Sequence, residues 1–142
     1  MGCMYCEENE NLALLMAPIC ELPSSRVYLF RNQAYRGRCV VAAGNHAEEL
    51  YELSDEELQG FMQDVKRVCR AVAGTVHPEK INLGLYGDTC KHVHWHIVPK
   101  QKGGPDFGGV FQMQPQPQVL LSDAEFETLI EQIRPKVLGL LV

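Results

Sequence analysis

Apolar and β-branched residues gather in four short runs that predict strands at residues 26–30, 38–43, 81–87 and 91–99. The second run is almost wholly apolar, which is typical of a central strand. Only residues 88–90 separate the last two runs, so we expect an antiparallel hairpin there. A shorter run at 109–113 predicts one more strand within a segment rich in Gly, Pro and Gln. Residues 12–19 are also apolar, but this run is too short to tell strand from helix.

A first long helix is predicted to begin after Ser54. Glu57 stands three residues later, and the two form a capping box, in which each side chain bonds the other's free backbone N–H. Apolar residues then recur at helical spacing and give the helix one apolar face. They are Leu58, Phe61, Met62, Val65, Val68, Cys69 and Val72. Gly74 is expected to end this helix.

The capping box recurs near the end of the chain, where Ser122 and Glu125 predict a second helix that Pro135 ends or kinks. Strands therefore precede a helix, and further strands precede another helix. This order indicates an α+β fold with an antiparallel sheet of about five strands and two main helices. The 142 residues show no internal repeat and suit a single domain spanning residues 1–142.

Composition narrows the classes of partner. The net charge is −5 and no block of Lys and Arg is present, so we expect no binding of duplex nucleic acid. A small anionic ligand remains compatible, because a pocket can be locally positive on an acidic protein. No apolar run reaches the roughly 18 residues of a spanning helix, and the N-terminus does not resemble a signal peptide. The expectation is a cytoplasmic protein without membrane contact.

The stretch HVHWHIV carries the most distinctive chemistry. His92, His94 and His96 occupy every second position, so in a strand they share one face. Neighbouring imidazoles would then stand about 7 Å apart along the strand, close enough for a pair to reach one ligand. Histidine is neutral or charged near pH 7 according to its surroundings, so the cluster suits a metal, an anion or a reacting phosphorus.

Cysteine usage gives a second candidate. Cys3 and Cys6 form a C-x2-C pair, whose spacing is typical of metal or redox sites. The other four cysteines stand singly and are expected to be small apolar residues rather than disulfide partners.

These segments resemble the histidine-triad (HIT) nucleotide hydrolases and transferases. HVHWHIV fits the family's His-φ-His-φ-His-φ-φ signature, where φ is apolar. Residues 37–61 resemble its strand after a Gly, its lone histidine (here His46) and the helix that follows. Residues 87–89, GDT, resemble its Gly-Gln-Ser/Thr stretch. The resemblance covers residues 26–100 and implies a HIT-like fold.

The resemblance also implies a reaction. A member of the family would act as a nucleotide phosphohydrolase, in which His94 attacks the α-phosphorus and forms a nucleotidyl-histidine intermediate that water hydrolyses. His96 would contact the non-bridging phosphate oxygens, and Thr89 would orient the phosphate or the leaving group. The substrates would be dinucleoside polyphosphates such as diadenosine tetraphosphate. The alternatives are a nucleoside phosphoramidate hydrolase and a zinc-stabilised nucleotide-binding module without turnover.

Other nucleotide contacts are less well defined by the resemblance. Asn32 and Asn82 are two candidates for the residue that holds the ribose hydroxyls. Asp88 occupies the position of the family's Gln, and a carboxylate repels a phosphate that an amide would bind. This departure motivates the alternative of a binding module without turnover.

Some relatives in the family carry a structural Zn²⁺, and the matching positions here are Cys3, Cys6, His46 and His92. Two thiolates and two imidazoles are a favoured tetrahedral zinc set. Members are typically homodimers, and we expect the same here. A further hypothesis makes the triad a catalytic metal site, although no carboxylate lies within its strand.

Overall fold

The computed structural model describes residues 2–139 and shows an α+β fold. Its five strands form one antiparallel sheet in the order β1-β2-β3-β5-β4, which confirms the expected fold class. The strands are β1 (Met16–Leu22), β2 (Ser25–Phe30), β3 (Cys39–Ala43), β4 (Lys80–Leu85) and β5 (His94–Lys100). The helices are α1 (Met4–Glu7), α2 (Glu10–Leu15), η1 (Leu50–Glu52), α3 (Asp55–Val76) and α4 (Asp123–Val137).

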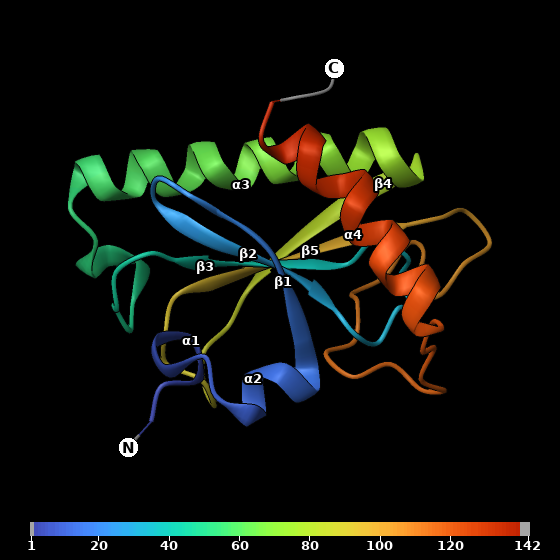
Figure 1. The fold of residues 1–142 in the computed structure, drawn as a ribbon, viewed down its shortest axis with the longest axis horizontal. Coiled ribbons are helices and arrows are strands. Elements are labelled where there is room, and N and C mark those ends of the chain that lie inside the picture. Colours follow the sequence, from blue (N-terminus) through green and yellow to red (C-terminus); the bar gives the residue numbers. More distant parts are fainter. Residues whose placement is uncertain (1, 140–142) are drawn as a thin grey trace.

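The two long helices cover one face of the sheet, and the N-terminal helices α1 and α2 lie on the other (Figure 1). Alternate strand residues divide accordingly, because successive side chains point to opposite faces. Val27, Leu29 and Val41 join the core beneath α3 and α4. Tyr28 and Val40 join a second, smaller cluster with Tyr5, Leu12 and other N-terminal residues. The smaller layer is where the histidines lie.

Both long helices begin as predicted, with the two capping boxes formed. The first does not end at Gly74, and the second is not ended by Pro135. Helix α3 passes Gly74 and ends at Val76, because Val76 packs against the core and Lys136 donates to the Gly74 carbonyl at 2.9 Å. Helix α4 passes Pro135, and its last residue, Val137, is fully buried. Tertiary contacts outweigh the two local stop signals.

Two expectations about strands were wrong, and one run that the pattern left undecided is resolved. The apolar run at 12–19 contains the end of α2 and the start of β1, an edge strand that accommodates Pro18 next to a bulge. The hairpin connection between β4 and β5 is longer than residues 88–90, since β4 ends at Leu85 and β5 begins at His94. Residues 109–113 form no strand. Their backbone is held instead by side chains, as when Lys100 bonds the Gly109 carbonyl.

None of the helices in the described part of the chain combines the length and apolar character needed to cross a bilayer.

Candidate functional site

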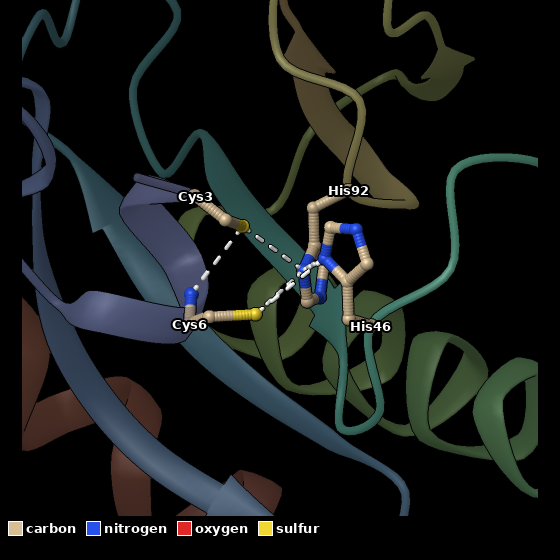
Figure 2. A group of neighbouring side chains, drawn as sticks. All are labelled: Cys3, Cys6, His46 and His92. Carbon is tan, nitrogen blue, oxygen red and sulfur yellow. Dashed lines mark hydrogen bonds between the residues drawn. The ribbon is translucent and has the colours of Figure 1, made fainter. Parts of the chain in front are cut away.

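Two cysteines and two histidines from distant parts of the chain form a compact cluster (Figure 2). Cys3 caps α1 and Cys6 lies within it, while His46 follows β3 and His92 lies two residues before the start of β5. One ligand atom from each residue can be chosen so that all four lie within 4.8 Å of one another. The resemblance named the same four residues, and the fold brings them together.

The donor spacing of this cluster fits a tetrahedral zinc site. Zn–N and Zn–S bonds of about 2.0–2.1 and 2.3 Å place tetrahedral ligand atoms about 3.3–3.4 Å (N to N) and 3.5–3.6 Å (N to S) apart. The His46 and His92 Nδ1 atoms are 3.1 Å apart. His92 Nδ1 lies 3.3 Å from the Cys3 sulfur and 3.5 Å from the Cys6 sulfur.

The hydrogen bonding of His92 also suits a metal ligand. Its Nε2 lies 2.7 Å from the Ala43 carbonyl oxygen, so Nε2–H donates there and Nδ1 keeps its lone pair. Carbonyl partners of this kind fix the tautomer of metal-ligating histidines. His92 was expected inside the strand, but it precedes β5, and its ring turns to the cysteines.

A cavity of about 310 Å³ opens beside this cluster and contains the other two triad histidines. Its lining comes from the N-terminal segment, β2, β5, the β4–β5 connection and the loop after β5. The lining residues are Met4, Tyr5, Leu15, Met16, Phe30, Tyr86, Gly87, Asp88, Thr89, Cys90, His94, His96, Met113 and Gln114. The volume lies within the range typical of small-ligand sites.

His94 has a single defined tautomer at the cavity wall. Its Nδ1 lies 2.6 Å from the carbonyl oxygen of His92 and donates to it, which leaves the lone pair on Nε2. The side chain is only 6% exposed. Burial lowers the pKa of His94 below its ordinary value and so favours the neutral imidazole. The geometry provides an uncharged nitrogen nucleophile.

His96 is held in the opposite tautomer. The Arg38 guanidinium donates from Nη2 to His96 Nδ1 at 3.1 Å, so the ring proton lies on Nε2. Burial, followed by the Arg38 charge, lowers the pKa of His96 to about 3. The rings of His94 and His96 have centroids 5.2 Å apart, so a hydrogen-bond acceptor and a donor stand side by side.

Tyr5 links the Cys/His cluster to the triad, a connection that the sequence did not reveal. It stands between the two cysteines, and its ring centroid lies 5.4 Å from that of His92 and 5.0 Å from that of His94. The side chain is 1% exposed, and its hydroxyl has no hydrogen-bond partner among the described residues. The only sequence signal was an aromatic residue inside the C-x2-C pair.

Two of the four residues proposed to contact nucleotide line the cavity. Asp88 and Thr89 are exposed residues of its rim. Asn32 is buried and binds backbone, with its amide donating to the Pro115 carbonyl at 3.1 Å and its oxygen accepting from two N–H groups. Asn82 lies on β4 outside this lining. We therefore assign neither asparagine to the ribose.

A wider groove of about 870 Å³ lies along α3 and α4. Basic side chains line it, including Lys66, Arg67 and Arg70, and none of the described residues in its lining is a histidine or a cysteine. It is less suited to covalent chemistry than the histidine cavity.

Fold and site together define an α+β protein with a histidine triad on one face of its sheet. The sequence profile of the HIT domain family matches residues 18–103, and the chain belongs to this family. The resemblance seen in residues 26–100 is thereby confirmed. Membership places the protein in a class of nucleotide hydrolases and transferases.

Two relatives by sequence cover most of the chain. The protein named hit from Bacillus subtilis is 28% identical over 122 residues, which is 77% of this chain and 83% of the relative. The adenosine 5'-monophosphoramidase hnt1 from Schizosaccharomyces pombe is 26% identical over 142 aligned residues, covering 96% of this chain and 99% of the relative.

Solved structures show the same fold. A histidine triad protein from Marinobacter aquaeolei has a TM-score of 0.83 and 19% identity, covering 94% of this chain and 96% of its own. A zinc-bound histidine triad family protein from Mycobacterium smegmatis has a TM-score of 0.68 and 20% identity, covering 99% and 96%.

Proposed function

We propose that this protein hydrolyses nucleotides at the α-phosphate through a nucleotidyl-histidine intermediate on His94. The observation that carries the proposal is the tautomer of His94. Its Nδ1–H is bonded to the His92 carbonyl at 2.6 Å, so the lone pair of Nε2 is available at a cavity wall. A positioned neutral nitrogen is what covalent catalysis at phosphorus requires.

Nε2 of His94 forms the new bond to phosphorus while the bond from phosphorus to the leaving group breaks. Water then attacks the same phosphorus, the P–N bond to His94 breaks, and the nucleoside monophosphate leaves. His96 donates its Nε2–H to a non-bridging oxygen as charge develops there. Thr89, on the cavity rim, is the residue that we assign to the phosphate or leaving group.

Two leaving groups are compatible with this chemistry. A nucleoside phosphoramidate releases an amine, and the S. pombe relative is named an adenosine 5'-monophosphoramidase. A dinucleoside polyphosphate such as diadenosine tetraphosphate releases a nucleotide. The cavity of about 310 Å³ is more compatible with one nucleoside monophosphate than with two nucleosides. We therefore favour the phosphoramidate and keep the dinucleotide as the second candidate.

Parallel assays with adenosine 5'-phosphoramidate and diadenosine tetraphosphate test the proposal, with release of AMP followed by chromatography. We expect AMP from both, with a larger kcat/KM for the phosphoramidate. A kcat/KM larger for the dinucleotide would reverse the preference. AMP binding without release from either substrate would instead support a binding module, the alternative that Asp88 suggested.

We also propose that Cys3, Cys6, His46 and His92 hold one Zn²⁺. The donor set, the interatomic distances and the tautomer of His92 support this assignment. The zinc-bound M. smegmatis neighbour shows that a chain of this fold can carry zinc. With four protein ligands, the ion would cross-link the N-terminus to the sheet rather than bind substrate.

A homodimer is the expected assembly. Strand β4 lies at one edge of the sheet, and it carries Leu83, which is 44% exposed. An apolar residue on an edge strand suits sheet extension across a two-fold axis. Sedimentation equilibrium should give twice the mass of one chain. A single-chain mass at micromolar concentration would contradict this prediction.

A further inference from the structure

We propose that Arg38 is the positioning residue for His96: it fixes the Nε2–H tautomer and strengthens that N–H as a donor to the nucleotide phosphate. The inference rests on the proposed function for its phosphate ligand. It concerns a residue that is fully buried, at 0% exposure, immediately before β3.

The first observation is the direct contact. Nη2 of Arg38 donates to Nδ1 of His96 at 3.1 Å. A guanidinium has no acceptor, so Nδ1 must carry the lone pair and Nε2 the proton. Val40 pairs with His96 across the β3–β5 ladder, and Arg38 lies two residues earlier on the same face. The sheet register therefore sets this contact.

The second observation is an uncompensated charge. Among the described residues, one ion pair forms, between Arg26 and Glu8. Arg38 therefore has no carboxylate partner within the described part of the chain. Its Nε atom is buried without a hydrogen-bond partner, and Phe30 lies beneath the guanidinium at 4.1 Å. The aromatic face and backbone carbonyls offset part of the cost of burying this cation, but no carboxylate among the described residues neutralises it. A phosphate in the adjacent cavity supplies that negative charge.

The third observation shows how the charge reaches the ligand. His96 lines the cavity, while Arg38 stands behind its ring. The N–H of Arg38 polarises the imidazole and makes Nε2–H a stronger donor, because hydrogen bonds in a chain reinforce one another. Through this hydrogen bond, the neutral His96 ring transmits the electrostatic effect of Arg38 to a phosphate bound in the cavity.

Arg38 also holds the cavity rim, which offers a rival explanation. Its Nη1 donates to the carbonyls of Gln112 and Met113 at 3.2 and 3.0 Å. If the role of Arg38 were purely structural, its two bonds would stabilise residues 112–113 without affecting His96. Tyr35 provides a matched control, because its hydroxyl accepts from the Gln112 N–H at 2.8 Å. Tyr35→Phe loosens the same segment and removes no hydrogen bond to His96.

Imidazole ¹⁵N spectra of the zinc-loaded protein test the proposal directly. In the wild type we expect Nε2 of His96 to be protonated and Nδ1 to be an acceptor. Arg38→Met should give mixed tautomers and raise the pKa of His96 from about 3 toward its ordinary value, since a positive neighbour is lost. The other titratable groups that share the cavity with His96 are His94 beside it and Tyr5, Tyr86, Asp88 and Cys90.

Kinetics supply the second readout. Arg38→Met should lower kcat/KM by about 10- to 100-fold, by analogy with the loss seen when the hydrogen-bond partner of a metal-ligating histidine is removed. Inorganic phosphate should shift the His96 resonances of the wild type and do so more weakly in this variant. Tyr35→Phe should lower stability but leave the His96 tautomer unchanged. Unchanged His96 resonances in Arg38→Met would overturn the proposal, and so would Tyr35→Phe reproducing the whole effect.

Arg38→Lys is a second variant that tests the proposal if Arg38→Met does not fold. It keeps a cation and one donor, so we expect Nε2-protonated His96 and a kcat/KM between those of wild type and Arg38→Met. Full activity with the His96 proton on Nδ1 would overturn the proposal. If the wild type hydrolyses no nucleotide, the proposed function fails, whereas the ¹⁵N spectra still report on Arg38.

Discussion

Replacing His94 with alanine should lower kcat/KM by about 10⁴-fold or more while leaving the protein folded, the scale expected when a covalent nucleophile is removed. The physical reason is the loss of Nε2, the nitrogen whose lone pair is kept free by the bond from Nδ1 to the His92 carbonyl. No described neighbour offers the same group, because Nε2 of His96 carries the proton and Nε2 of His92 donates to Ala43.

The fold should survive because His94 contributes little to the main core. Its ring packs on Tyr5 and His96 in the smaller layer, whereas the core beneath α3 and α4 is independent of it. We expect a loss of about 1–3 kcal/mol, which is smaller than the stability of a typical domain. Circular dichroism melting measures this directly.

A matched control is His77→Asn. His77 is exposed at the end of α3 with a φ of 50°, a conformation that asparagine tolerates. This variant should keep wild-type kcat/KM. Acid-quenched wild type should carry an adenylyl group on His94 by mass spectrometry, and the alanine variant should carry none. Wild-type turnover by folded His94→Ala would show that another group attacks phosphorus.

Local signals in the sequence predicted the elements that local interactions determine. The capping boxes at Ser54 and Ser122 placed the starts of both long helices, because each bond lies within one turn. Gly74 and Pro135 did not end them, since burial of Val76 and Val137 depends on distant residues. Residues 109–113 were misjudged for the same reason.

In the site as well, the sequence predicted the features that depend on local spacing and missed one that depends on tertiary contacts. Alternation placed His94 and His96 on one face, and the resemblance named four residues that the fold gathers into a cluster able to hold a metal ion. Arg38 was missed, although a charged residue opening an apolar strand was a visible signal. Its contact with His96 follows from the β3–β5 register, which hydrophobic pattern alone does not specify.

Removing the zinc ligands should destabilise the protein and reduce its activity without abolishing it. Helix α1 has only four residues and is too short to be stable alone. It is attached to the sheet through the Cys/His cluster that would hold the ion, through the buried Tyr5 ring, and through Arg26, which donates to the Tyr5 carbonyl at 2.9 Å. Without the ion, we expect a loss of about 2–4 kcal/mol and a fall in Tm of roughly 5–15 °C.

The expected loss of activity follows from the position of Tyr5. Its ring lies 5.0 Å from that of His94 and lines the same cavity. Release of α1 frees this ring, so His94 is held less rigidly and kcat/KM should fall by about 10- to 100-fold. Tyr5→Ala leaves all four ligands in place. It should reproduce the kinetic loss while retaining one zinc per chain.

Elemental analysis and kinetics of the Cys3→Ser/Cys6→Ser variant measure both effects. We expect one zinc per chain in the wild type, none in this variant and an unchanged content in the control Cys20→Ser, whose cysteine lies on β1. Below its melting temperature the zinc-free variant should still form the adenylyl adduct, because His94 and His96 are not ligands of the cluster. A folded, zinc-free protein with no turnover, restored by adding Zn²⁺, would make the ion catalytic and refute the structural assignment.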